Sequence, residues 1–184
     1  MSVREENRKK AISDIADHLM KEGLAKTSLR QLAAAADVSD RMLLYYFENK
    51  DEVMLAALSH LAERLTLQLN SIPDKPMPIG ELFDRAAAMI DDESVRPFLN
   101  LWIEATANAV RSIHPYPLIA STLAAGFLSW MEDRLIAPEG STKSASAAML
   151  MSMIDGLEIV RICAGEQAYA DARASISRTL RNKD

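Results

Sequence analysis

The stretch from residue 27 to residue 50 constrains the fold of this chain more than any other. Its first half carries apolar residues at helical spacing, which predict a short helix that Thr27 or Ser28 can cap. Asp37 then suits a tight turn, because Asp is one of the few residues that tolerate a left-handed backbone. Ser39 is a good cap for a second short helix. The stretch therefore predicts two short helices joined by a turn.

The second of these helices has a clear inner and outer face. Leu43 and Phe47 stand four residues apart, so we expect both to face inward. The outward residues are then Asp40, Arg41, Leu44 and Tyr45, with Tyr46 at the margin. Two short helices of which the second displays Arg and Tyr form a helix-turn-helix, a design whose second helix enters the major groove of DNA.

The same residues resemble a known family. Residues 38–53 read Val38-Ser39-x-x-x-Leu43-x-x-Tyr46-Phe47-x-Asn49-Lys50-x-x-Val53, preceded by Thr27-Ser28-Leu29-Arg30-Gln31-Leu32-Ala33. This pattern resembles the DNA-binding domain of the TetR family of transcriptional regulators, over roughly residues 8 to 58. It includes the junction from Phe47 to Lys50 into a long following helix, which generic helix-turn-helix pairs lack.

The resemblance implies a fold and a function. The expected fold is all-α, with an N-terminal three-helix helix-turn-helix domain joined by a long helix to a C-terminal helical bundle that dimerises. The expected function is a ligand-responsive transcriptional regulator, a repressor that binds a palindromic double-stranded DNA operator as a homodimer. A small molecule of unknown identity, bound in the C-terminal domain, would release it.

Three positions depart from the family's usual pattern. Asp37 stands where the family usually has Gly, an acceptable replacement at a positive φ angle. Asp40-Arg41 replaces a basic residue followed by Gly, and Leu44 replaces an aromatic residue. An acid at a DNA face repels phosphate, but Asp can accept a hydrogen bond from cytosine N4. These departures change the expected contacts and leave the expected fold unchanged.

The predicted DNA-binding residues are Thr27, Ser28, Ser39, Asp40, Arg41, Leu44, Tyr45, Tyr46 and Lys50. Arg41 could bind guanine through two hydrogen bonds, and the two tyrosines could contact phosphate or a thymine methyl group. Lys50 lies in the first turn of the long helix, where the helix dipole also favours a phosphate. The alternative interpretation is a solvated helix face with two aromatic rings packed on the long helix.

Charge is distributed unevenly along the chain. The net charge is −5, yet residues 1–50 hold nine Lys and Arg against eight Asp and Glu, and so carry +1. A local basic surface on an acidic molecule is compatible with specific DNA binding, because screening makes phosphate contacts local. The acidic remainder predicts weak non-specific affinity for DNA.

Beyond the motif the chain reads as helices only. A first helix is expected over 4–22, stopped by Gly23, and a long helix from Asn49 to about residue 70. Three prolines within residues 71–78 predict a linker. Further helices are expected over 79–91, 94–113, 118–136, 142–164 and 168–182. We divide the chain into a DNA-binding domain, residues 1–50, and a ligand-binding and dimerisation domain, residues 51–184.

The helix over 142–164 is apolar nearly all round, whereas a surface helix should have one polar face. Small residues at Ala148, Ser152 and Gly156 would permit close approach of another helix. The family resemblance implies a dimer interface made by the helices 142–164 and 168–182. The alternative is an ordinary buried helix.

A small-molecule site is expected where aromatic and Met side chains gather in the predicted helices. The candidate ligand-binding residues are Phe83, Met89, Phe98, Trp102, Phe127, Trp130 and Met131. An apolar cavity with a few polar anchors is what such a site needs, but the same residues also describe a plain core.

Other chemistry has little support in the sequence. The three histidines lie in different segments without metal-ligand spacing, and no phosphate-binding glycine loop occurs, so we expect no enzyme, no metal and no cofactor. Cys163 is expected to be a buried, inert thiol in a reducing cytoplasm. No run of eighteen apolar residues or signal-peptide pattern occurs, which favours a soluble cytoplasmic protein without membrane contact. Two rivals stay open: a helical-bundle enzyme, and a protein-interaction module without DNA binding.

Overall fold

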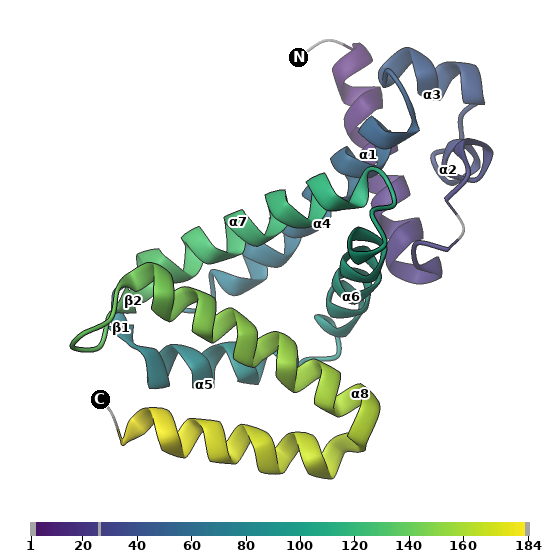
Figure 1. Cartoon of the computed structure of the whole chain (residues 1–184). Coiled ribbons are helices and arrows are strands. Elements are labelled where there is room, and N and C mark those ends of the chain that lie inside the picture. The colour runs from purple at the N-terminus through teal and green to yellow at the C-terminus, as the bar shows by residue number, and fades with distance from the viewer. Residues whose placement is uncertain (1–2, 26, 183–184) are drawn as a thin grey trace. The chain divides into compact units, whose positions relative to one another are not determined.

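The computed structural model describes residues 3–25 and 27–182, and helices dominate it (Figure 1). The helices are α1 (Val3–Glu22), α2 (Leu29–Ala35), α3 (Asp40–Tyr46), α4 (Lys50–Leu69), α5 (Ile79–Ile90), α6 (Arg96–Val110), α7 (Tyr116–Arg134) and α8 (Lys143–Arg181). Two strands of two residues each, β1 (Met77–Pro78) and β2 (Leu135–Ile136), complete the set. The all-α prediction is confirmed, and the chain divides into two compact units.

The first unit runs to Gln68 and also includes Arg96–Leu123. It therefore contains α1 to α4, the whole of α6 and the first turns of α7. Its core is continuous from the helix-turn-helix into α4 and α6 and contains these fully buried or nearly buried side chains: Ile15, Leu19, Leu32, Leu43, Phe47, Met54, Leu101 and Ile119. Leu43 and Phe47 face inward as the sequence predicts, because their four-residue spacing places both on the side of α3 that meets α1 and α2.

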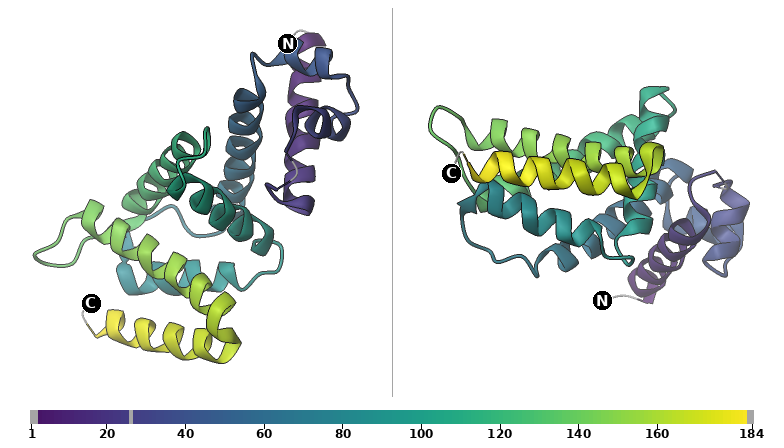
Figure 2. Two further views of the ribbon diagram at one scale, coloured as in Figure 1. Left: turned by 45° about the vertical axis from the view of Figure 1, so that its right-hand side comes forward. Right: turned by 90° about the horizontal axis from the view of Figure 1, so that it is seen from below.

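The second unit comprises Leu69–Val95 and the chain from Ala124 onward. In it α5 packs along α8, and the two arms of α8 run back beside each other (Figures 1 and 2). The strands β1 and β2 pair in parallel, Met77 with Leu135 and Pro78 with Ile136. The predicted linker thus ends in a short strand and the predicted helix over 118–136 ends two residues early, because backbone pairing between distant segments has no local sequence signal.

Gly165 divides α8 into two arms. Its φ of 87° and ψ of 174° are not helical, so the helix changes direction there. This fits the prediction of two helices over 142–164 and 168–182.

The prediction for Cys163 is wrong, because its side chain is exposed on the outer side of the first arm of α8. The apolar composition of that arm indicated burial, but α5 and the second arm of α8 cover only part of its circumference.

Candidate nucleic-acid interface

The caps that the sequence predicts define both helices of the motif. The Ser28 side chain accepts a hydrogen bond from the Gln31 backbone N–H at 3.3 Å, and the Gln31 side chain accepts one from the Ser28 N–H at 3.0 Å. This capping box begins α2. The Ser39 hydroxyl likewise accepts from the Met42 N–H at 3.2 Å and begins α3. Between them Asp37 takes a φ of 53°, the left-handed turn conformation predicted for it.

The outer face of α3 is exposed over its length. Leu44 is 44% exposed and Tyr45 is 58% exposed, values that are high for large side chains with an apolar body. Asp40 and Arg41 in the first turn are exposed as well. Outside α3, the exposed candidates are Ser28, Ser39 and Lys50. Seven of the nine predicted DNA-binding residues are therefore open to a partner.

The other two candidates, Thr27 and Tyr46, are buried. Thr27 is 8% exposed and its hydroxyl donates to the Leu24 carbonyl at 3.1 Å, which closes the loop before α2. Tyr46 is 9% exposed and lies 5.7 Å from the Tyr45 ring, centroid to centroid. Both residues support the surface from within, and any contact of theirs with DNA remains a prediction.

Two arginines of α1 hold the end of α3, a role that sequence reasoning missed. The Arg4 guanidinium lies 4.7 Å from the centroid of the Tyr45 ring and donates to the Tyr45 carbonyl at 3.1 Å. Arg8, one turn later, donates to the Tyr46 carbonyl at 3.3 Å and stacks over the Phe47 ring at 4.6 Å. These carbonyls belong to the last turn of a seven-residue helix, where cations are favourable.

Arg8 also ties the motif to α4. Its Nη2 lies 3.0 Å from Glu52 Oε1, and Glu52 Oε2 accepts from the Glu48 N–H at 2.6 Å. The four-residue spacing of Arg4 and Arg8 was the available sequence signal, since it places both on one face of α1. Their partners could not be identified from the sequence because these lie about forty residues away.

The start of α4 carries a free cation. The Asn49 side chain accepts from the Glu52 N–H at 2.9 Å and so begins the helix as predicted. Lys50 follows, exposed and without an ion-pair partner among residues 3–25 and 27–182. A lysine in the first turn of a 20-residue helix adds its charge to the positive end of the helix dipole, which is the arrangement that backbone phosphates favour.

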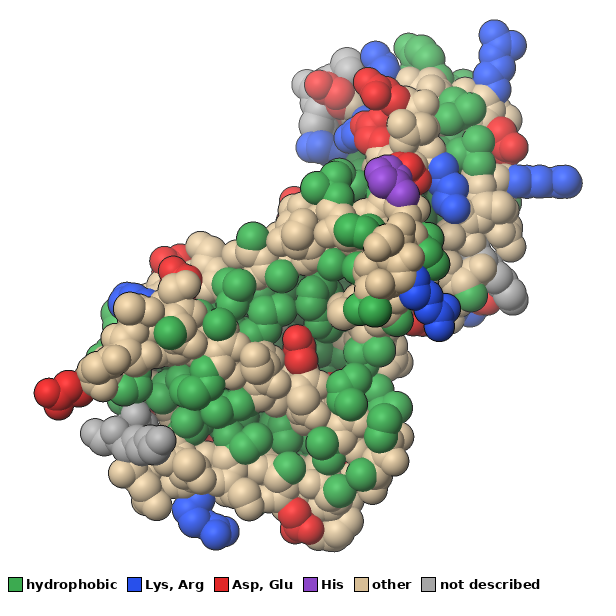
Figure 3. Space-filling view, in the orientation of Figure 1, with side chains coloured by type: hydrophobic (Ala, Val, Ile, Leu, Met, Phe, Trp, Pro, Cys, Tyr) green, Lys and Arg blue, Asp and Glu red, His purple; other side chains and the backbone are tan. Residues whose placement is uncertain are grey.

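Lys and Arg side chains also project from the outer surface of this part of the molecule, with acidic side chains among them (Figure 3). This mixture agrees with the small positive charge of residues 1–50.

A family model matches the N-terminal part of the chain. Residues 12–57 match the model described as bacterial regulatory proteins, tetR family. Residues 12–57 of this chain form a TetR-type DNA-binding domain. The match spans the second half of α1, the helix-turn-helix and the first turns of α4, which are the elements that build the exposed surface described above.

Several solved structures share the whole fold of this chain. A TetR-family transcriptional regulator from Cytophaga hutchinsonii superposes with a TM-score of 0.78 at 17% identity, covering 100% of this chain and 98% of that one. A transcriptional regulator from Rhodococcus sp. Rha1 gives 0.72 at 21% identity, with 96% and 97% covered. The multidrug binding protein EbrR, complexed with proflavin, gives 0.70 at 24% identity, with 94% and 98% covered. No curated protein matches the sequence.

The seven candidate ligand-binding residues are divided between the two units. Phe98 and Trp102 of α6 belong to the first unit, and the other five, Phe83, Met89, Phe127, Trp130 and Met131, belong to the second. Phe83 is fully buried and Trp130 is 8% exposed. The Trp130 indole N–H is buried and has no hydrogen-bond partner among the described side chains and backbone groups.

No group of three or more His, Cys, Asp or Glu side chains in the described part of the chain is arranged to hold a metal ion. No helix within residues 3–25 and 27–182 combines the length and apolar character needed to cross a membrane.

Proposed function

We propose that this protein is a cytoplasmic TetR-family repressor that binds a palindromic operator as a homodimer and is released by a small molecule bound in its C-terminal domain. The observation that carries the proposal is the exposed face of α3 with the free Lys50 beside it. Arg41 and Tyr45 are exposed on this face, and Arg4 and Arg8 donate to the carbonyl groups at the end of the helix that carries them, which supports their contact with base edges and phosphates.

The specific contacts follow from side-chain chemistry. Arg41 reads guanine, Tyr45 and Leu44 contact the sugar-phosphate backbone or a thymine methyl group, and Lys50 binds a phosphate. Ser39 can donate to phosphate through its hydroxyl group while it caps α3. The Ser28 hydroxyl donates to Gln31 Oε1 at 2.6 Å, and a contact with phosphate would replace this hydrogen bond. Asp40 selects cytosine at one position, because its carboxylate accepts from N4 and repels acceptors.

The outer side of α8 supports dimerisation. Met149, Ile159 and Ile162 are 40%, 46% and 57% exposed, and small residues lie between them at Ser152 and Gly156. Figure 3 shows hydrophobic side chains gathered over this part of the second unit. An exposed apolar face on a helix indicates a protein interface, and two operator half-sites require two DNA-binding domains.

The unpartnered indole N–H of Trp130 supports a ligand site in the second unit. A buried donor without an acceptor is costly, and a ligand carbonyl or ether oxygen would satisfy it. The proposed response is a population shift, in which the ligand favours a conformation whose two DNA-binding domains are wrongly spaced for successive major grooves.

Selection of binding sites from random double-stranded DNA tests the proposal. We expect an inverted repeat whose half-sites lie about one helical turn, 34–36 Å, apart or a multiple of it. An Arg41→Ala protein should lose the preference for guanine at one position in each half-site, while Arg85→Ala, at an exposed position of α5, should select the wild-type site. Selected pools without any shared sequence would contradict the proposal and favour the protein-interaction module.

A further inference from the structure

The end of α3 is capped by side chains of another helix. The carbonyl groups in the last turn of a helix lack partners within it, and in α3 this turn is half of a seven-residue helix. Phe47, the next residue, has an extended backbone with φ −135° and ψ 143°, so the chain cannot continue the helical hydrogen bonds. The Tyr45 and Tyr46 carbonyl groups accept instead from Arg4 and Arg8, in the first turns of α1, which pack against α3 (Figure 1).

Arg8 has a structural role. Its Nε donates to the Tyr46 carbonyl, its Nη2 pairs with Glu52 of α4, and its guanidinium stacks over the Phe47 ring, which is 2% exposed. A guanidinium group carries five N–H donors in one plane, and those of Arg8 point at two helices at once. Arg8 therefore joins α3 and α4 to α1.

The contacts of Arg4 lead instead to the outer face of α3. Its Nη2 donates to the Tyr45 carbonyl at 3.1 Å, and its guanidinium lies over the Tyr45 ring, 4.7 Å from the centroid. Arg4 is itself exposed, and Tyr45 is 58% exposed, more than Leu44 beside it. Arg4 thus places a cation at the edge of the face that α3 offers to DNA.

These contacts restrict the Tyr45 side chain. A tyrosine on a helix surface exchanges between rotamers, and binding costs the entropy of that exchange. A cation over one side of the ring favours a single rotamer, and the Tyr46 ring, 5.7 Å away between centroids, limits the space further. A ring held in this way is oriented before DNA arrives, which lowers the cost of binding.

We propose that Arg4 is a further DNA-binding residue, which positions Tyr45 and binds a backbone phosphate beside the Tyr45 contact. One N–H of its planar fork serves the Tyr45 carbonyl, and the fork has further donors for phosphate oxygens. The DNA-binding surface then extends from α3 to the first turn of α1. The phosphate contact rests on the proposed function, whereas the positioning of Tyr45 does not.

NMR spectra of the free protein test the positioning of Tyr45. Because the ring current of an aromatic ring shields protons above its face, we expect the Arg4 Hδ and Nε–H signals to lie upfield of their positions in Tyr45→Leu. The Arg8 signals are the internal control and should not move, since Arg8 stacks over Phe47. Arg4 signals at the same positions in both proteins would overturn the positioning of Tyr45.

Operator titrations over a range of salt concentrations test the phosphate contact. Arg4→Met should weaken operator affinity about tenfold or more, since a charge-assisted hydrogen bond is lost in each half-site. It should also lower the slope of log affinity against log salt by about 2 for the dimer, because each phosphate contact in B-DNA contributes about 0.9. Arg4→Lys should keep most of the slope but only part of the affinity, because an ammonium group neutralises a phosphate without forming a planar fork.

Two variants of α1 are the controls. Lys10→Met removes the same charge from the same helix, but Lys10 pairs with Asp14 of α1 itself, so the salt slope should change much less. Arg8→Met removes a structural guanidinium and should lower the midpoint of thermal unfolding by roughly 2–8 °C. Arg4→Met should change this midpoint much less than Arg8→Met does, because Arg4 is exposed and joins only α1 and α3.

The salt slope separates a DNA contact from a purely structural role. Wild-type affinity in Arg4→Met would overturn the proposal. Weaker binding with an unchanged slope would overturn the phosphate contact, because a residue that only supports α3 releases no counterions. If the wild type binds no operator at all, the proposed function fails together with the phosphate contact, and the NMR result still decides whether Arg4 positions Tyr45.

Discussion

At the scale of single residues, the proposed DNA-binding face depends on side chains that contact little of their own chain. Tyr45 is 58% exposed and touches Arg4 and Tyr46, and Lys50 forms no ion pair with the described residues. Exposed side chains such as these bury little apolar surface and form no strong ion pairs, so they contribute little to the stability of the free protein. Their chemistry is that of partners for phosphate and base edges.

Replacing these residues should therefore affect operator binding far more than folding. We expect Tyr45→Ala and Lys50→Ala each to weaken operator affinity at least tenfold, since each contact contributes roughly 1–3 kcal/mol per half-site. Fluorescence anisotropy measures the affinity, and sedimentation should show an intact dimer for both. Lys75→Ala, in an exposed loop of the second unit, is the control and should bind normally. Unchanged affinity in both variants would refute the proposed docking face.

At the scale of elements, one carboxylate joins both arms of α8 to the end of α5. Asp91 accepts from Arg161 Nη2 at 2.7 Å and from the Tyr169 hydroxyl at 2.6 Å, and it also pairs with Arg173. Arg161 precedes Gly165 and the other two follow it, so the Asp91 contacts fix the reversal of the chain. The Arg161 guanidinium also stacks over the Tyr169 ring at 3.7 Å.

The direction of the reversal depends on Gly165. Its φ of 87° and ψ of 174° lie in a region that only glycine adopts readily, although a Cβ there would meet no atom within 4 Å. We expect Gly165→Ala to lower the free energy of unfolding by about 1–3 kcal/mol through backbone strain alone. Gly126 in α7 has a helical backbone, and a Cβ there would also meet no atom within 4 Å. Gly126→Ala should therefore leave the free energy of unfolding unchanged or raise it by about 0.5–1 kcal/mol. Urea unfolding at fixed protein concentration compares them, and equal effects would contradict the strain argument.

The Tyr169 phenol makes the free energy of unfolding depend on pH in the alkaline range. Burial, and then the hydrogen bond to Asp91, raise its pKa from 10.0 to about 12. The folded state therefore holds the proton more tightly than the unfolded state, so this stabilisation is complete below pH 10 and is lost as the pH rises to about 12. Tyr169→Phe should cost about 1 kcal/mol at pH 7 through the lost hydrogen bond, and its stability should decline less than that of the wild type between pH 10 and 12. Urea unfolding measures this free energy, and an equal decline in the wild type and in Tyr169→Phe between pH 10 and 12 would contradict this explanation.

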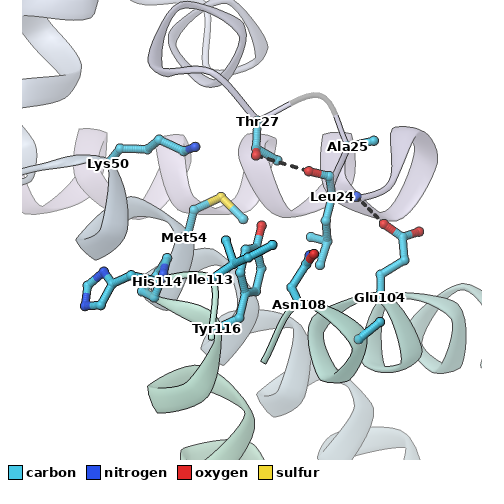
Figure 4. A pocket seen from close by; sticks show the side chains of 12 residues that line it. Leu24, Ala25, Thr27, Lys50, Met54, Glu104, Asn108, Ile113, His114 and Tyr116 are labelled. Carbon is cyan, nitrogen blue, oxygen red and sulfur yellow. Dashed lines mark hydrogen bonds between the residues drawn. The ribbon is translucent and has the colours of Figure 1, made fainter. Parts of the chain in front are cut away.

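Local features of this fold could be predicted from the sequence, whereas long-range ones could not. The caps at Ser28, Ser39 and Asn49 and the turn at Asp37 are confirmed, because each depends on a few neighbouring residues. The Asp91 contacts and the pocket between the loop before α2, the start of α4 and the end of α6 (Figure 4) join residues many positions apart, and no spacing rule connects them. Cys163 was placed wrongly because apolar composition does not tell which face of a helix its own chain covers.

At the scale of the whole molecule, recognition of a palindromic operator requires two copies of the chain. A palindromic operator presents the same half-site twice, and a two-fold symmetric dimer matches it with one self-complementary interface. We propose the apolar outer side of α8 as this interface. A Cβ at Gly156, on that side, would meet no atom of its own chain within 4 Å.

A large side chain at Gly156 should thus leave the single chain folded but keep the two copies apart. We expect Gly156→Arg to weaken dimerisation by roughly 100-fold or more, because the bulk and charge enter a symmetric interface twice. Gly126→Arg is the matched control, since its position is equally unobstructed in one chain. Sedimentation velocity over a range of concentrations distinguishes them. A Gly156→Arg protein that remains dimeric would place the interface elsewhere.

The most direct test of the central claim is fluorescence anisotropy with the DNA next to the protein's own gene, titrated at several salt concentrations. We predict nanomolar binding, far tighter than to scrambled DNA, with an affinity that falls steeply as salt rises because phosphate contacts release counterions. Equal affinity for the native and scrambled DNA, or binding that salt does not change, would contradict the claim that the face formed by α3 and Lys50 recognises an operator there.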